Sequence, residues 1–200
     1  MSLHRVNLAD MPPQPWRNGG GSMRELLNWP ALASAGAHAE EWTLRVSVAE
    51  IERDGPFSHY PGIERWFAVL EGTGVALALP AGERRLTRGE TPVHFAGESA
   101  PGCRLIDGAT RDLNLMVRRA SGQGRMRLAQ PGDSFAAAGA RWLGVYAASE
   151  IRVQAGTSSS EAPGAVETLA PGTLLWTEAP GTEPWRMQGA GLAYWMGLSP

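Results

Sequence analysis

The sequence predicts an all-β protein built from two antiparallel barrels in tandem. Glycine and proline are frequent and evenly spread, with 25 glycines and 15 prolines in 200 residues, which is typical of many short strands joined by tight turns. Short segments in which apolar and polar residues alternate recur in both halves of the chain. Two successive sets of such segments, similar in size, predict two barrels that fold as one compact unit over residues 1–200.

The first set of expected strands begins at residues 42–49, where apolar and polar residues alternate. The apolar residues share one face of this strand, and Arg45 and Ser47 share the other. Further strands are expected at 65–70, 75–79, 91–95 and 113–118. Gly-Pro and Pro-Gly turns separate these segments, and together they predict a first barrel over about residues 40–119.

The second set of expected strands lies in the later half of the chain. These strands are expected at 141–147, 151–154, 174–177 and 192–198. With the N-terminal segment 1–30, about residues 120–200 would form the second barrel. Residues 31–41 are alanine-rich and predict a short helical turn, while residues 22–29 fit a strand as well as a helical turn.

Composition excludes several classes of function. The 18 basic and 20 acidic residues give a net charge of −2, so no basic field is available to recruit nucleic acid. All of the basic residues are arginine, whose guanidinium fork suits carboxylates. The single Cys103 rules out an internal disulfide and fits a buried small side chain. With neither a signal peptide nor a long apolar run, we expect a cytoplasmic protein that does not contact membrane.

Residues 54–64 resemble a cupin metal motif that has lost most of its ligands. Phe57 stands where a first histidine is expected, His59 stands at the second position, and Glu64 supplies the carboxylate. Two ligands fall short of the three or more that a transition metal usually takes, and His94 is the most plausible further donor. We therefore expect a cupin-like double-stranded β-helix that binds neither metal nor cofactor.

The run Pro15–Ser22 contains three consecutive glycines. Their backbone amides could form a nest for an anion, or the glycines could simply allow a tight turn. A second group of polar residues, Arg45, Ser47, Asp112, Asn114 and Arg118, falls on single faces of two expected strands. These residues would line a ligand pocket if their faces point into the barrel and would be surface residues if they point outward.

The order of several motifs resembles the HutD/Ves family, whose members are often encoded beside histidine-utilisation enzymes in bacteria. The matching stretches are Pro15–Gly21, Arg45–Ala49, Asp54–Ser58, Pro61–Arg65, Leu70–Gly72, Asp107–Gly108 and Asp112–Arg119. The resemblance implies a two-barrel cupin without metal-binding histidines and a binding or regulatory role in histidine catabolism, with a formylated glutamate as a proposed ligand. It also implies that the Asn18–Gly21 turn and Arg65 belong to the pocket.

The leading hypothesis is a binding protein for a small carboxylate, with arginine side chains as clamps. The expected ligand-binding residues are Asn18, Gly19, Gly20, Gly21, Arg45, His59, Arg65 and Asn114. The alternative is a metal-independent hydrolase or isomerase that uses His59 and Glu64 as acid and base. Because barrel edges are often paired between subunits, a homodimer is also expected.

Overall fold

The computed structural model describes residues 2–29, 42–135, 139–156, 164–178 and 180–200. Within these ranges the regular secondary structure is almost entirely antiparallel β-strand, which confirms the all-β prediction. The helices of the described chain are three short 3-10 turns, Leu8–Asp10 (η1), Gly97–Ser99 (η2) and Arg119–Ser121 (η3). The chain divides into a central unit, Met11–Gly122, and a terminal unit, Met1–Asp10 with Gln123–Pro200.

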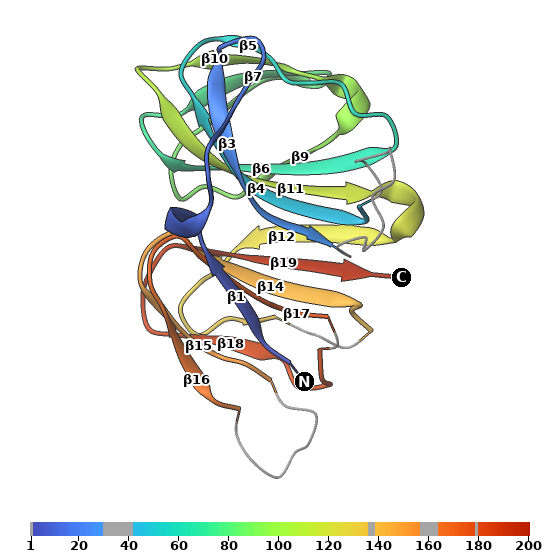
Figure 1. Ribbon diagram of the computed structural model, residues 1–200, viewed down its shortest axis with the longest axis vertical. Coiled ribbons are helices and arrows are strands. Elements are labelled where there is room, and N and C mark those ends of the chain that lie inside the picture. Colours follow the sequence, from blue (N-terminus) through green and yellow to red (C-terminus); the bar gives the residue numbers. More distant parts are fainter. Residues whose placement is uncertain (1, 30–41, 136–138, 157–163, 179) are drawn as a thin grey trace. The chain divides into compact units, whose positions relative to one another are not determined.

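The central unit contains two antiparallel sheets (Figure 1). In order across it, the six-stranded sheet consists of β2 (Gln14–Pro15), β3 (Gly21–Trp29), β4 (Leu44–Ile51), β11 (Thr110–Arg118), β6 (Ile63–Glu71) and β9 (Val93–Ala96). The four-stranded sheet consists of β5 (Gly55–Pro56), β10 (Gly102–Leu105), β7 (Val75–Leu79) and β8 (Gly82–Leu86).

An apolar core lies between these two sheets. Phe67 and Val69 from β6 contribute to it from the larger sheet, and Val75 and Leu77 from β7 contribute from the smaller one. Cys103 joins the same cluster, and burial raises the pKa of its thiol to about 12. The cysteine therefore behaves as a small apolar side chain and not as a nucleophile.

The core also decides which face of β4 points inward. Ala49 and Ile51 belong to the core cluster, and side chains two residues apart in a strand share a face. Arg45 and Ser47 therefore project from the same, core-facing side of the sheet as Ala49 and Ile51. This outcome selects the pocket interpretation of these polar residues over the surface interpretation.

The terminal unit has its own pair of antiparallel sheets. The five-stranded sheet consists of β1 (His4–Asn7), β17 (Thr173–Thr177), β14 (Trp142–Ala147), β19 (Ala193–Ser199) and β12 (Gln123–Leu128). The four-stranded sheet consists of β13 (Ser134–Phe135), β18 (Trp185–Gln188), β15 (Ile151–Gln154) and β16 (Val166–Leu169). Its core includes Trp185 and Trp195, whose rings meet edge to face at 6.5 Å.

The N-terminal segment does not fold as a whole with the later half of the chain, and this part of the prediction for residues 1–30 is corrected. Only β1 joins the terminal unit, by pairing with β17. β3 instead pairs with β4 from Gly21 to Trp29, in an antiparallel ladder whose register shifts once, between Glu25 and Leu27. Residues 22–29 are thus strand, while the helical turn expected at 31–41 lies outside the described residues.

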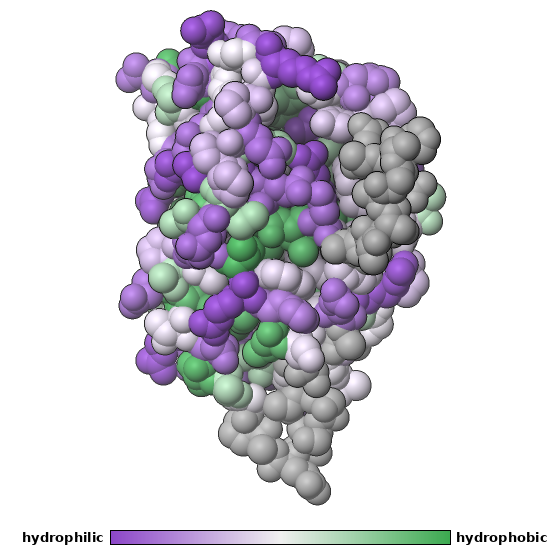
Figure 2. Space-filling view, viewed as in Figure 1, coloured by the Kyte–Doolittle hydropathy of each residue, from purple (hydrophilic) through white to green (hydrophobic). Residues whose placement is uncertain are grey.

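The surface is mostly hydrophilic on the face that Figure 2 shows, with smaller apolar areas between the polar ones. In the described part of the chain, Val166 is the one large hydrophobic residue that is exposed. No helix in this part of the chain has the length and apolar character needed to cross a membrane. The expected homodimer receives no support from these observations and stays a prediction.

Candidate ligand-binding site

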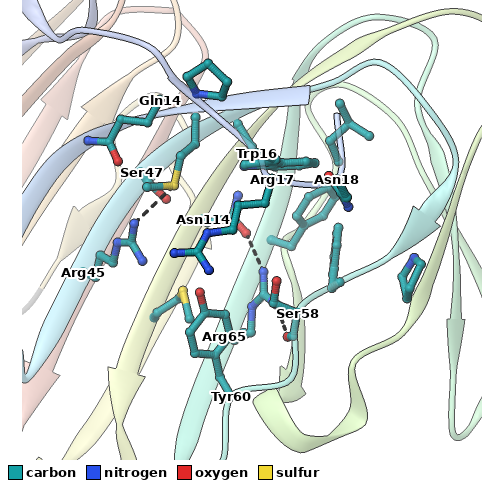
Figure 3. A pocket seen from close by; sticks show the side chains of 18 residues that line it. Gln14, Trp16, Arg17, Asn18, Arg45, Ser47, Ser58, Tyr60, Arg65 and Asn114 are labelled. Carbon is teal, nitrogen blue, oxygen red and sulfur yellow. Dashed lines mark hydrogen bonds between the residues drawn. The ribbon is translucent and has the colours of Figure 1, made fainter. Parts of the chain in front are cut away.

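A cavity of about 430 Å³ lies in the central unit, against the core-facing side of its six-stranded sheet (Figure 3). Three arginines contribute to its wall, Arg17, Arg45 and Arg65. Neutral polar groups come from Gln14, Asn18, Ser47, Ser58, Tyr60 and Asn114, and apolar surface comes mainly from Trp16, Met23, Phe57, Phe67 and Met116. A mixed lining of this size suits a small organic molecule that carries negative charge.

Strand register brings the polar groups of the wall together. Met116 of β11 pairs with Arg45 of β4 on one side and with Arg65 of β6 on the other. Two residues along β11, Asn114 pairs with Ser47. These positions alternate with outward-facing residues, so all of these side chains project from the same face of the sheet into the cavity.

Arg65 is the most deeply placed charge in the cavity. Only 7% of this residue is exposed, and burial lowers its pKa to about 10. Its Nη2 donates to Asn114 Oδ1 at 3.2 Å, and its Nη1 lies 3.5 Å from the Ser58 carbonyl oxygen. The guanidinium also lies 4.8 Å from the centre of the Phe57 ring, a cation–π contact. No carboxylate of the described chain forms an ion pair with it.

Arg45 differs from Arg65 because it has a carboxylate beside it. Its Nε lies 3.0 Å from Glu25 Oε2, a separation that suits an ion pair, although the N–H is not directed at this oxygen as in a hydrogen bond. Its Nη2 lies 3.2 Å from Met23 Sδ. Glu25 therefore compensates much of the charge of Arg45.

The N-terminal segment reaches the cavity through a tight turn. The Trp16 amide donates to the Gly21 carbonyl at 2.9 Å, and the Gly19 amide donates to the Trp16 carbonyl at 3.0 Å. Asn18 Oδ1 accepts a further bond from the Gly20 amide at 3.0 Å. This turn carries Trp16, Arg17 and Asn18 to the cavity wall.

The glycines of this run shape the turn and do not line the cavity, which corrects their expected role. The Gly19 and Gly20 amides are already used within the turn, as donors to Trp16 and Asn18. At Gly21, φ is +157° and an added Cβ would lie 2.0 Å from the Glu50 carbonyl oxygen. Only glycine fits where the start of β3 approaches the end of β4 so closely.

Arg17 is a wall residue that the sequence analysis did not select. It is exposed, and Figure 3 shows its side chain extending from the N-terminal segment across the cavity. The available signal was its place between Trp16 and Asn18, in a run already singled out for its glycines. Its direction could not be inferred because a turn, unlike a strand, has no regular alternation of side chains.

His59 and Glu64 are not brought together in the cavity. His59 is exposed and is not part of the wall. Glu64 Oε2 lies 2.6 Å from His94 Nε2, and Glu64 Oε1 accepts a hydrogen bond from Arg119 at 2.6 Å. Because Arg65 points inward, its neighbour Glu64 points to the other face of β6. This geometry gives no support to His59 and Glu64 as an acid and base pair or to His59 as a ligand-binding residue.

A metal-binding group of three or more His, Cys, Asp or Glu side chains does not occur in the described ranges. The wall of the cavity, as described, contains none of these residue types. Glu64 and His94 do meet, but on the outer face, where the His94 ring stacks on Trp66 with the ring centres 4.5 Å apart. The donors near the cavity are guanidinium, amide and hydroxyl groups, which suit anions better than metal cations.

Asp112 lies on the same face of β11 as Asn114, two residues nearer the start of the strand. It is completely buried, pairs in register with Ala49 and Val69, and accepts a 2.7 Å hydrogen bond from the Thr110 hydroxyl. Burial raises the pKa of Asp112 to about 8. It does not contribute to the cavity wall, and neither does Arg118, which donates to the Trp42 carbonyl.

Comparison with known proteins identifies the family from nearly the whole chain. The family model described as HutD matches residues 8–195. The chain belongs to the HutD/Ves family. A curated HutD/Ves relative from Pseudomonas putida, an uncharacterized 21.2 kDa protein in the hutC 3′ region, is 34% identical over 114 residues, or 57% of each chain. Protein Ves of Citrobacter koseri is 34% identical over 128 residues, 64% of each chain. The match thus spans about six tenths of each curated relative.

Solved structures extend the likeness over the full chain. HutD from Pseudomonas fluorescens SBW25 (formate condition) matches with a TM-score of 0.80 and 25% identity, covering 99% of this chain and 98% of that one. A conserved protein of unknown function from Pseudomonas aeruginosa PAO1 matches with a TM-score of 0.82 and 26% sequence identity, covering 100% of both chains. A Bacillus subtilis oxalate decarboxylase variant matches with a TM-score of 0.59 and 10% sequence identity, covering 98% of this chain and 77% of that one. This likeness shows a cupin-like fold and nothing further.

Proposed function

We propose that this chain binds a small carboxylate in the cavity of its central unit and acts as a binding or regulatory protein in histidine utilisation. The observation that carries the proposal is Arg65, a buried guanidinium at the cavity wall without a carboxylate partner in the described chain. Burial of an uncompensated cation costs free energy. A bound carboxylate would offset this cost.

The surroundings of Arg65 favour a carboxylate in particular. A planar guanidinium can donate two parallel hydrogen bonds to the two oxygens of a carboxylate. The Arg65 Nε is buried and has no hydrogen-bond partner, and its Nη1 has only the 3.5 Å contact to Ser58. The hydrogen-bonding capacity of Arg65 is thus not filled within the described chain, while the aromatic rings of Phe57 and Tyr60 lie within 6 Å of the guanidinium.

The link to histidine utilisation rests on the family. One relative is described by its place in the hutC 3′ region, and family resemblance suggests formylglutamate as a ligand. Urocanate and glutamate are further carboxylates of the same pathway. All three are small carboxylates, the class of ligand that the arginines and the volume of the described cavity favour.

The proposal is tested by isothermal titration of the whole chain with formylglutamate, urocanate and glutamate. At least one should bind, and Arg65→Gln should weaken binding by roughly tenfold or more, since hydrogen bonds to charged groups are worth about 1.5–3 kcal/mol. Arg53→Gln is the matched control, because Arg53 is exposed and lies outside the cavity wall.

Since Arg65 is buried, near-ultraviolet circular dichroism should first establish that the Arg65→Gln variant is folded. If that variant does not fold, Arg65→Lys replaces it; lysine keeps the charge but loses the fork, so affinity should still fall. Absence of binding heat with all three carboxylates, at protein concentrations suited to micromolar affinity, would contradict the proposal.

We also propose that the two units are the two barrels of a bicupin. In support, each unit pairs a larger antiparallel sheet with a four-stranded one around its own core. A crystal structure in which either unit fails to close into a barrel would reject this arrangement.

We further propose that the chain associates into a homodimer. A monomeric mass from light scattering would reject the homodimer.

A further inference from the structure

The charges of the cavity wall do not balance. Three guanidinium groups contribute to the wall, while its described residues include no aspartate or glutamate. Glu25 lies 3.0 Å from Arg45 and compensates that one arginine. Arg17 and Arg65 form no ion pair with any carboxylate of the described chain. Two positive charges of the wall are therefore left without a counter-charge.

These two arginines approach the cavity from different places. Arg65 belongs to β6 and is 7% exposed, so its guanidinium lies at the buried end of the wall. Arg17 belongs to the N-terminal turn and is exposed, so it lies at the entrance. In Figure 3 the Arg17 side chain extends across the cavity from a different segment than the strands that carry the other two arginines.

The backbone of Arg17 is held in position although its side chain is exposed. The flanking residue Trp16 donates its amide to Gly21 at 2.9 Å and accepts from the Gly19 amide at 3.0 Å. On the other side, Asn18 accepts from the Gly20 amide. A guanidinium on such a fixed turn loses less conformational entropy on binding an anion than one on a loose loop.

We propose that the ligand of this cavity is a dianion with two carboxylates, one bound by Arg65 at the buried end and the other by Arg17 at the entrance. This inference rests on the proposed carboxylate-binding function and adds Arg17 as the specificity-determining residue. A monocarboxylate would leave one of the two guanidinium groups uncompensated. A dicarboxylate compensates both, and the apolar wall between them, including Phe57 and Met116, accommodates its carbon chain.

The test compares straight-chain acids that have equal numbers of carbons and one or two carboxylates: butyrate with succinate, valerate with glutarate, and hexanoate with adipate. Isothermal titration of the whole chain should give, for at least one pair, an affinity for the dicarboxylate that is roughly tenfold or more above that for the monocarboxylate. Arg17→Gln should remove this preference by weakening dicarboxylate binding, while monocarboxylate affinity changes by less than about twofold.

Arg53→Gln controls for the change in net charge, because Arg53 is exposed, lies outside the wall and bonds through its amide to the same glycine turn. It should keep the preference for dicarboxylates. Equal affinities within every pair, or a preference that survives Arg17→Gln, would overturn the inference while leaving the carboxylate-binding proposal intact. Failure of both acid series to bind the unaltered chain would count against that proposal itself.

Discussion

Two buried ionisable residues of the central unit, Arg65 and Asp112, have surroundings that leave the first charged and the second neutral near pH 7. Arg65 stays a cation at neutral pH because amide, carbonyl and aromatic groups surround it, although burial lowers its pKa to about 10. Asp112 has one hydrogen bond, from Thr110, and its Oδ1 has no partner. Burial therefore raises the pKa of Asp112 to about 8 and makes the neutral acid its stable form near neutrality.

Asp112 should make the stability of the fold depend on pH. In the unfolded chain an aspartate titrates near about 3.9, whereas in the fold the pKa of Asp112 is about 8. Between these values the folded state holds a proton that the unfolded state lacks. The free energy of unfolding should therefore fall as pH rises through this range and level off above it.

Asp112→Asn should remove this contribution to the pH dependence. The difference in the free energy of unfolding between the variant and the unaltered chain should therefore shift in favour of the variant from about pH 5 to about pH 8. Urea denaturation at a series of pH values measures the effect. Thr110→Val should change the pH dependence in the opposite direction. The Thr110 hydroxyl lowers the pKa of Asp112, so its removal should raise that pKa and extend the fall in the free energy of unfolding to higher pH. Parallel pH profiles for Asp112→Asn and the unaltered chain would contradict this prediction.

Among the structural elements, the N-terminal turn and β3 connect the cavity wall to the sheet. β3 pairs with β4, and the two-residue strand β2 pairs with the start of β3. The turn between β2 and β3 is held to the end of β4 by bonds from the amides of Glu52 and Arg53 to the Gly20 carbonyl. The position of Arg17 at the entrance thus depends on a short hairpin and on glycines that allow a close approach.

Gly21→Ala should disturb this hairpin. The new Cβ would meet the Glu50 carbonyl oxygen at 2.0 Å, and φ at this residue is +157°. We expect a loss of roughly 2 kcal/mol or more in the free energy of unfolding, measured by urea denaturation, and weaker carboxylate binding because Trp16 and Arg17 move with the turn. Gly102→Ala is the matched control: its Cβ would lie 3.8 Å from Ala78 Cβ, an ordinary contact, so stability should change little. Equal losses in the two variants would refute the steric argument.

At the scale of the whole molecule, the chain is divided into two units, each with its own core. The terminal unit combines residues from both ends of the sequence, because β1 pairs with β17 along His4–Asn7 and Thr173–Trp176. Pairing of strands so far apart in sequence carries an entropic cost of loop closure, which lowers the free energy gained on folding. The central unit is continuous in sequence and carries the entire described wall of the cavity.

The purified chain should contain no stoichiometric transition metal, and chelators should leave its thermal unfolding unchanged. The physical reason is the donor set, since His59 lies outside the cavity wall and Glu64 is engaged with His94 and Arg119 on the outer face. Such metals usually need three or four protein ligands. Elemental analysis after dialysis measures the content. Near-equimolar metal that disappears in His59→Ala would overturn this prediction.

The sequence by itself determined the all-β class, most strand positions and the family, because alternation and turn residues act locally. It could not decide which face of β4 lines the cavity, because both faces are buried: Leu44 and Val46 on one face and Ser47 on the other. An apolar face is therefore not in itself the face of the cavity. It also suggested His59 and Glu64 as an acid and base pair. Glu64 instead lies on the opposite face of β6 from the cavity, because its neighbour Arg65 points into the cavity. Only the tertiary structure assembled Arg17, Arg65 and Asn114 around one cavity, because strand register and the glycine turn join segments that lie far apart in sequence.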